Sequence, residues 1–411
     1  MYYLNNMNPR DLDKKALIDA STKRIFSFGP RDLASALAYE NMRYGLGKIM
    51  YALDDYDVSC VFGPDATVTR NVERWESGFG YGAVIRWPKK GIFFPEIKPN
   101  ACGMLLAKID ELPSREDVIR RMSEVAEAEL FLDGVRLKPD FGHGNHFFEF
   151  YSVLESSPDV GDVVPKDSFY VLLHGSAPEK KAEFYGSTDC EERVMTPMGE
   201  VSYLEGAVGK DYYRRWVDLE DFSKRRREYI LKEVIGDYKV VSNTTHQGLT
   251  KENEMRLGCY NSVEKNLFPV AMRWDIPVYV FRGKPNMSEE VIGRVGFRAR
   301  AEETGMLERL EQTNILPHGG GYKVDLEYTK INVVNGGRRN HFVLSGAKPA
   351  SSVSEMIDNS KRGVSSFGEM VIMNPRELPY DYRGLSVIEK TMEYELGTPV
   401  AKLQPLMTLK V

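Results

Sequence analysis

The sequence predicts a mixed α/β (α+β) fold, and two patterns carry that prediction. Long segments such as Tyr212–Ile235 place apolar residues at the spacing of one helix face. From Val58 onward, short apolar runs broken by glycine and proline are typical of strands. Of the 411 residues, 42% are hydrophobic, so the chain can bury a large core. Length alone allows two or three domains or one elaborate domain, and we expect a single domain over residues 1–411.

The helical segments follow one another with recognisable start and stop signals. Residues 10–55 are expected to be helical, because Pro30 can start a helix and leucines recur on one face after it. Ser114 begins a second helix with a capping-box-like start, and that helix should run to about Leu130. Further helices are expected at Tyr212–Ile235, Glu302–Leu310 and Ser386–Leu396. The basic run at residues 224–227 fits a solvated helix face better than a phosphate contact.

Composition excludes several classes of protein. No apolar run approaches the roughly 20 residues that cross a bilayer, and the N-terminus shows no secretory signal. The four cysteines are far apart without a C-x-x-C pair, which argues against a disulfide framework or zinc ribbon and for a reducing cytosol. With a net charge of -5, binding of nucleic acid would depend on local basic patches.

Four of the six histidines share one setting, a glycine-containing turn at the end of an apolar strand. They are His146, His174, His246 and His318. If these strands belong to one sheet, their ends converge on one rim, where α/β proteins place their sites. Together with Cys102, the imidazoles form a borderline-soft donor set suited to Zn, Mn, Fe or Co. Each histidine taken alone is also compatible with a hydrogen-bonded structural residue in a turn.

The segment His318-Gly319-Gly320-Gly321 suggests a second kind of chemistry. Three successive glycines can expose backbone N–H groups that bind an anion such as phosphate. A histidine beside such a cradle is a plausible nucleophile for phosphorus. A flexible turn that carries a histidine is the alternative.

The order of these motifs resembles the RtcB-type tRNA-splicing ligases, which join RNA ends using GTP and manganese. The motifs are Gly80-Tyr81-Gly82, Asn100-Ala101-Cys102-Gly103, Gly144-Asn145-His146-Phe147-Phe148-Glu149, Leu173-His174-Gly175-Ser176, His246, Pro317-His318-Gly319-Gly320-Gly321, Tyr382-Arg383-Gly384 and the closing run from Val400 to Lys410. The resemblance covers residues 79–411 as a family-like catalytic core. Residues 1–75 match poorly and are expected to form a helical N-terminal region.

The resemblance implies a role for each matching residue. Cys102 would bridge two manganese ions, with His146 on one ion and His174 and His246 on the other. His318 would carry GMP as a covalent phosphoramidate and pass it to an RNA 3′-phosphate, after which a 5′-hydroxyl attacks and releases GMP. The nucleotide would be held by Asn145, Phe147, Glu149, Gly319, Gly320, Gly321, Tyr382 and Lys410.

The resemblance also implies a fold, partners and a location. The fold would be RtcB-like, with stacked β-sheets around a central metal-containing cleft flanked by helices. Partners would be RNA ends (tRNA halves or broken RNA), GTP and an archease-type activator, with no membrane, in the cytoplasm. One or two Mn ions are expected, and Zn or Co would also suit the donors.

Three departures from the family pattern leave a second function open. Pro99 stands where the family has a metal-binding aspartate, unless Glu96 or another carboxylate replaces it. The family's Gly-Ser-Met-Gly guanine loop is absent, and its basic residue after His-x-Gly-Ser has no clear counterpart after Ser176. The alternative to a ligase is therefore a divergent, non-ligating paralogue that acts as a metal-dependent phosphoesterase or an RNA-end-binding protein.

Overall fold

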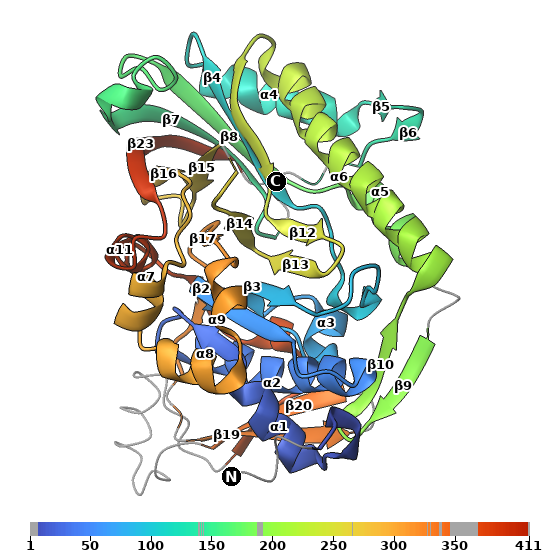
Figure 1. The fold of residues 1–411 in the computed structure, drawn as a ribbon. Helices are drawn as coiled ribbons and strands as arrows, with labels where there is room; N and C mark the ends of the chain where they lie inside the picture. Colours follow the sequence, from blue (N-terminus) through green and yellow to red (C-terminus); the bar gives the residue numbers. More distant parts are fainter. Residues whose placement is uncertain are drawn as a thin grey trace, which may run out of the picture.

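A computed structural model describes residues 7–138, 140, 142, 144–186, 192–264, 266–326, 328, 330–336, 339–345 and 369–409 of the chain. It shows a mixed α/β fold with several sheets, in agreement with the predicted fold class (Figure 1). His143, Cys190 and Lys410 lie outside the described residues. Among the described helices, none combines the length and apolar character that crossing a bilayer requires.

A seven-stranded antiparallel sheet forms the upper half of the molecule in Figure 1. Its order is β11-β4-β8-β7-β23-β16-β15. The strands are β4 (Gly103–Ile109), β7 (Phe147–Ser156), β8 (Phe169–Gly175), β11 (Lys239–Thr245), β15 (Leu267–Val270), β16 (Val278–Arg282) and β23 (Thr398–Leu409). The edge strands β11 and β15 approach each other, so the sheet curls into a nearly closed, barrel-like shape.

The two faces of this curled sheet bury different clusters. The outer face of β4, β7 and β8 packs on α4 (Arg115–Glu127) and α6 (Gly206–Ile235) through residues such as Leu105, Val171 and Trp216. The inner face buries alternate residues, among them Met104, Tyr151 and Leu172. Since successive side chains of a strand point to opposite faces, His174 shares the inner face with Leu172.

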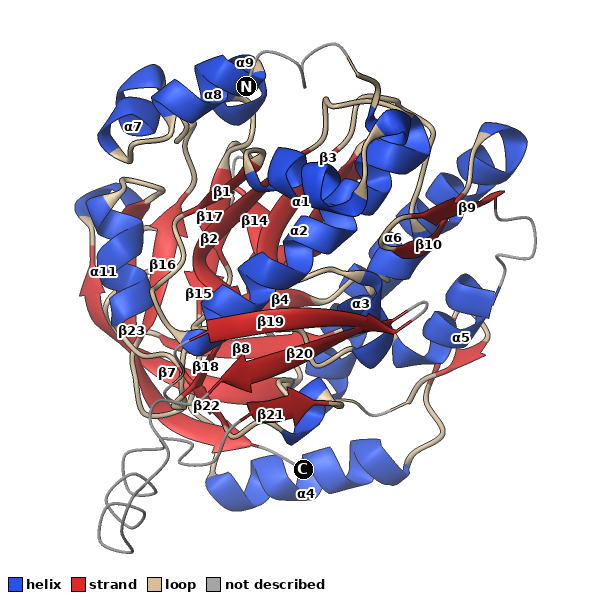
Figure 2. Ribbon diagram, turned by 90° about the horizontal axis from the view of Figure 1, so that it is seen from below, coloured by secondary structure: helices blue, strands red, loops and turns tan. Residues whose placement is uncertain are grey.

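A second sheet of five strands lies beneath the first. Its order is β1-β2-β3-β13-β12, with β1 parallel to β2 and the other pairs antiparallel. The strands are β1 (Ile25–Ser27), β2 (Ser59–Thr67), β3 (Tyr81–Arg86), β12 (Gln247–Lys251) and β13 (Glu254–Leu257). The long helix α2 (Leu33–Leu53) is apolar on most sides and buried between this sheet and neighbouring elements (Figure 2).

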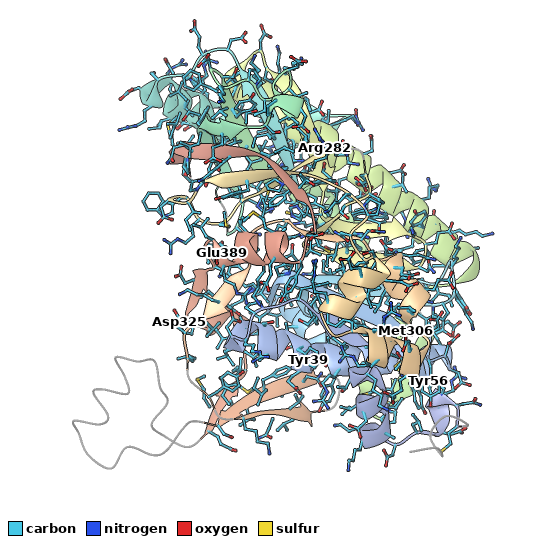
Figure 3. The ribbon with its side chains drawn as sticks, turned by 60° about the vertical axis from the view of Figure 1, so that its left-hand side comes forward. Tyr39, Tyr56, Arg282, Met306, Asp325 and Glu389 are labelled. Atoms are coloured by element: carbon cyan, nitrogen blue, oxygen red, sulfur yellow. The ribbon has the colours of Figure 1, made fainter. Side chains whose placement is uncertain are left out.

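Smaller elements complete the molecule around these two sheets. Short pairs are β5 (Phe131–Leu132) with β6 (Val135–Arg136), β9 (Glu192–Thr196) with β10 (Gly199–Tyr203), β14 (Cys259–Asn261) with β17 (Ile315–Pro317), and β18 (Tyr322–Val324) with β22 (Tyr380–Tyr382). A three-stranded sheet contains β19 (Lys330–Gly336), β20 (Arg339–Ser345) and β21 (Glu369–Ile372). The remaining helices are α1 (Lys14–Thr22), α3 (Val72–Ser77), α5 (Pro178–Gly186), α7 (Glu289–Arg294), α8 (Arg298–Thr304), α9 (Leu307–Glu311) and α11 (Ser386–Glu393). Side chains fill the space between the sheets, and Glu389 marks α11 in Figure 3.

The helix predictions hold for the long, periodic segments. Helix α4 begins after the Ser114 cap, whose side chain accepts a hydrogen bond from the Asp117 amide, and α6 covers the whole of the expected segment. The helical prediction for residues 10–55 is confirmed for α1 and α2 but wrong for Ile25–Ser27, which form β1. The helical description of residues 1–75 is also wrong for Ser59–Thr67, since this segment is the buried strand β2.

Candidate metal centre and adjoining cavity

Of Cys102 and the four histidines predicted to form a site, four meet because of the strand register of the seven-stranded sheet. Cys102 directly precedes β4 and His146 directly precedes β7, while His174 lies near the end of β8. Gly103 pairs with Gly175 on one side and with Thr245 on the other, and Phe147 pairs with His174. His246 follows Thr245, and its amide donates to the Cys102 carbonyl at 3.0 Å. The four side chains therefore share one end of the sheet.

The potential ligand atoms are close enough to bind one ion. Cys102 Sγ lies 3.0 Å from His174 Nε2 and 3.3 Å from His146 Nε2, and His174 Nε2 lies 3.3 Å from His246 Nε2. Ligands on a tetrahedral ion with ordinary Zn–N and Zn–S bond lengths lie roughly 3.3–3.6 Å apart. Among the described residues, Cys102, His174 and His246 form a buried group that can hold a metal ion.

Hydrogen bonds on the far side of two imidazole rings direct their Nε2 atoms toward the thiol. His174 Nδ1 lies 2.8 Å from the carbonyl oxygen of Asn145, and His146 Nδ1 lies 2.9 Å from an Asp140 carboxylate oxygen. Both partners are acceptors, so each Nδ1 carries a hydrogen, and the neutral ring of His174 presents an unprotonated Nε2 to the thiol. Electron-rich atoms then face one another at about van der Waals contact. A cation between them relieves the repulsion, so the donor chemistry fits a bound transition metal.

The protonation equilibria of the centre also suit a cation. Burial acts to raise the pKa of the Cys102 thiol, but the imidazoles of His174 and His146 outweigh it and hold that pKa well below its usual range. Burial lowers the pKa values of His174 and His246. For His146 burial acts in the same direction, yet the thiolate and Asp140 outweigh it and raise the pKa to about 10. The centre therefore favours a thiolate paired with a protonated His146 ring and flanked by the neutral rings of His174 and His246; a cation bound to the thiolate would displace the His146 proton.

His318 lies beside the centre and is oriented by a carboxylate. Its ring centroid is 4.3 Å from that of His246, and its Nδ1 is 3.0 Å from Asp65 Oδ2. Asp65 comes from β2 and is buried, and the same oxygen accepts the His318 amide at 3.3 Å. Because Asp65 holds the hydrogen on Nδ1, Nε2 keeps its lone pair and is the nucleophilic nitrogen of this ring.

The glycines after His318 allow close packing of the backbone. A side chain on Gly319 would come within 2.4 Å of the Ala271 carbonyl oxygen, and one on Gly320 within 2.5 Å of the Arg383 carbonyl oxygen. The Gly320 N–H donates to Ala271 at 3.1 Å. The prediction that all three glycine amides can bind an anion is therefore wrong for Gly320, whose donor is already used.

A cavity of about 380 Å³ opens next to His318 and His174. It is lined by all the described residues predicted to hold a nucleotide, namely Asn145, Phe147, Glu149, Gly319, Gly320, Gly321 and Tyr382. The cavity is also lined by residues for which the sequence predicted no role, among them Tyr81, Tyr322, Trp274 and Asp381. Thr408 of β23 donates to Glu149 at 3.2 Å, so the last strand contacts a residue of the cavity wall.

The described residues supply no replacement for the carboxylate missing at Pro99. Glu96 accepts a hydrogen bond from the Ser202 amide at 3.0 Å and does not belong to the ligand group around Cys102. Asp140 is the nearest carboxylate to His146, but it faces Nδ1 and also pairs with Arg226 at 2.7 Å. The Cys102–His146 side of the centre therefore has a carboxylate behind the imidazole but none directed at a second ion.

Buried cations lie behind the centre, where a solvated helix face was predicted. Arg226 and Arg227 of α6 are 2% and 0% exposed, so that prediction is wrong for both. Arg227 donates to the Gly175 carbonyl at 3.2 Å and lies against Gly103. Lys181 of α5 donates to Ser176 at 2.9 Å, which places a basic group beside the His174-Gly175-Ser176 segment. The sequence signal that could have shown the burial of the two arginines is their helical spacing from the apolar residues of the amphipathic helix α6.

Sequence comparisons add no assignment to this geometry. No protein-family model matches the sequence, and no curated protein matches it.

Proposed function

We propose that this chain is an RtcB-type RNA ligase, which joins an RNA 3′-phosphate or 2′,3′-cyclic phosphate to a 5′-hydroxyl end. The observation that carries the proposal is the position of His318. Its Nδ1 is held by Asp65, and its ring adjoins a buried Cys–His centre and a cavity lined by the residues expected to hold a nucleotide. The proposal includes the RtcB-like arrangement of a single domain around a central cleft.

His318 would act first as a nucleophile toward GTP. Its Nε2 attacks the α-phosphorus, a P–N bond forms, and the bond to the bridging oxygen breaks with release of pyrophosphate. Asp65 keeps the proton on Nδ1 and stabilises the positive charge that develops on the ring. The aromatic rings of Phe147, Tyr322 and Tyr382 line the cavity in which the base would lie.

The second and third steps transfer GMP through the RNA. An oxygen of the RNA 3′-phosphate attacks the phosphorus on His318, and the P–N bond breaks to leave His318 neutral. The 5′-hydroxyl of the other end then attacks the activated 3′-phosphate, forms the phosphodiester and releases GMP. A cyclic phosphate must first be opened by water to give the 3′-phosphate.

The donors fit Mn and also suit Zn or Co. Cys102, His174 and His246 would hold one ion, and His146 together with Cys102 would contribute to a second. When bound, the metal supplies Lewis-acid stabilisation of phosphate charge. Because no carboxylate faces the Cys102–His146 side, we propose one tightly held ion.

The same observation favours a second candidate function. A centre with one tightly held ion beside an anion-accepting cavity also suits a metal-dependent phosphoesterase or an RNA-end-binding protein that does not ligate. Cytoplasmic location and an archease-type activator belong to the ligase proposal and depend on it.

The test is covalent labelling of His318. Wild-type protein incubated with Mn and α-³²P-labelled GTP should form an acid-labile, alkali-stable adduct, because a phosphoramidate hydrolyses in acid. His318→Ala should lose the label completely. The matched control is His341→Ala, since His341 lies on β20 and does not line the cavity.

Two outcomes separate the candidates. Absence of a wild-type adduct under conditions where the protein retains its metal excludes the ligase mechanism. Hydrolysis or tight binding of a 2′,3′-cyclic phosphate RNA without an adduct then supports the second function.

A further inference from the structure

Trp274 differs from the other three tryptophans of the chain. Trp75, Trp87 and Trp216 are at most 1% exposed, whereas Trp274 is 69% exposed. A single exposed apolar side chain is common, whereas several grouped around a groove mark a surface that binds a partner. The position of this ring identifies the partner.

Trp274 lies where two neighbouring strands separate. Strand β16 pairs with β23 only as far as Val278 opposite Leu403. Beyond Leu403, β23 continues beside β7 alone, so the chain preceding β16 diverges from residues 404–409. A groove of about 680 Å³ lies between them, and α4 contributes Arg115 and Ile119 to its wall.

The groove adjoins the His318 cavity. Trp274 and Asp275 line both spaces, so a chain lying in the groove can extend its end toward His318. Because the two spaces are continuous, we consider an RNA chain whose end enters the His318 cavity as the occupant of the groove.

The lining of the groove combines exposed apolar side chains with one guanidinium group, that of Arg115, and one carboxylate, that of Asp275. Ile119 is 50% exposed and Leu406 is 43% exposed. Arg115 has no ion pair within the described part of the chain, and Arg273 neutralises Asp275 through contacts of 2.6 and 2.9 Å. Aromatic rings beside guanidinium groups are the usual means of binding single-stranded nucleic acid, because bases stack on the ring while cations contact phosphates.

The free edge of β23 argues against an extended peptide as the occupant. Pro405 lacks an N–H group, and the register of β23 shifts between Pro405 and Met407. A proline and an irregularity at an unpaired edge interrupt the ladder that an added strand needs.

We propose that Trp274 is the stacking platform for an unpaired base of the RNA strand whose terminal phosphate reaches His318. The inference rests on the proposed function, because it takes the RNA end as the ligand of the His318 cavity. The groove then binds single-stranded RNA rather than duplex, since the stacked base must be free of its partner.

The first test measures binding of a fluorescein-labelled, 10-nucleotide RNA with a 3′-phosphate to the full, metal-loaded chain without GTP. Trp274→Ala should weaken binding by about 5- to 150-fold, which corresponds to the loss of one base–aromatic stack. Trp274→Phe should stay within about threefold of wild type. The matched control is Met195→Ala, because Met195 is 66% exposed but lies on the β9–β10 hairpin outside both spaces.

The second test uses the fluorescence of Trp274. Because the other tryptophans are buried, acrylamide should quench Trp274 selectively, and the RNA should protect it. The same RNA with abasic residues at its 3′-terminal positions should bind without this protection.

The results distinguish this inference from the proposed ligase function. Wild-type-like binding by Trp274→Ala, or binding that leaves Trp274 open to acrylamide, overturns the stacking role even if His318 takes the GMP label. Protection of Trp274 without any GMP label supports the stacking role in a non-ligating RNA-end-binding protein.

Discussion

At the scale of single residues, two carboxylates determine which nitrogen each neighbouring imidazole presents. Asp65 contacts His318 Nδ1 and Asp140 contacts His146 Nδ1. Each contact fixes a hydrogen on Nδ1, so that Nε2 is the nitrogen directed at a phosphorus or a metal ion. The proposed nucleophile and one proposed metal ligand therefore depend on carboxylates that never touch the substrate or the metal.

Asp65→Asn should slow GMP transfer to His318 while preserving the fold. An asparagine fits the same space, but its amide can donate to Nδ1 and so favour the wrong tautomer of the ring. We expect the single-turnover rate of label incorporation to fall by about 10²- to 10⁴-fold.

The control for Asp65 is Asp325→Asn, because Asp325 (labelled in Figure 3) is an exposed carboxylate that does not line the cavity. It should label at the wild-type rate. If Asp65→Asn also keeps the wild-type rate, Asp65 does not orient the nucleophile.

The sequence predicted the histidines and the cysteine better than it predicted their supporting residues. Strand-end turns with glycine are local patterns, and the sheet register brings them together. Asp65 was missed because it lies within an otherwise apolar strand, far from His318 in sequence. The available signal was the carboxylate itself, since a charged group inside a buried strand requires a partner.

At the scale of secondary-structure elements, β13 is fixed to its surroundings by a buried ion cluster. Glu254 pairs with Arg256 on the same strand at 2.9 Å and with Arg86 on β3. Arg86 and Arg256 also donate to carbonyl groups at residues 309–314, so the cluster ties the five-stranded sheet to the segment before β17. That segment leads directly to His318.

Glu254→Gln should destabilise the protein most strongly near neutral pH. Burial acts to raise the pKa of Glu254, but Arg256 and Arg86 outweigh it and lower the pKa from 4.5 to about 2. This depressed pKa stabilises the fold above pH 4.5, and the contribution is lost as the pH falls toward 2. The shift corresponds to about 3 kcal/mol in the free energy of unfolding.

Urea unfolding of wild type and Glu254→Gln between pH 3 and 7 checks this expectation. The difference in unfolding free energy should be largest above pH 5 and shrink at pH 3. Glu155→Gln, which removes an exposed partner of Lys402, should change the unfolding free energy by less than about 1 kcal/mol. A difference that does not vary with pH would contradict the assignment to Glu254.

Errors at the element scale have physical causes. The three-residue strand β1 was included in a helical segment because it is too short to show its own periodicity, and its pairing with β2 decides its conformation. Arg226 and Arg227 looked like solvent-facing charges, yet Arg226 pairs with Asp140 and donates to the Lys138 carbonyl, and Arg227 donates to the Gly175 carbonyl inside the protein. Asp140, Lys138 and Gly175 are all distant in sequence, at separations of 86, 88 and 52 residues.

At the scale of the whole molecule, a bound metal should stabilise the folded chain. The centre joins the ends of β4, β7, β8 and β11, and an unfolded chain does not present this site. At a free metal concentration about 100 times the dissociation constant, the free energy of unfolding should rise by about 2.7 kcal/mol.

Purified wild-type protein should contain a transition metal by elemental analysis, and chelation should lower its unfolding temperature. Cys102→Ser should retain much less metal and show little response to chelator. Cys60→Ser serves as the control, because Cys60 is a buried free cysteine in the core. Wild type without any transition metal would remove the basis for the metal centre.

Strand β23 has a consequence for the order in which this protein can mature on the ribosome. It lies between β7 and β16, although both are synthesised before it. Until residues 398–409 leave the exit tunnel, the largest sheet stays divided into two unjoined parts, and Glu149 lacks its contact with Thr408. A nascent chain released early therefore lacks the strand that joins the two parts of this sheet and supports Glu149 in the cavity wall.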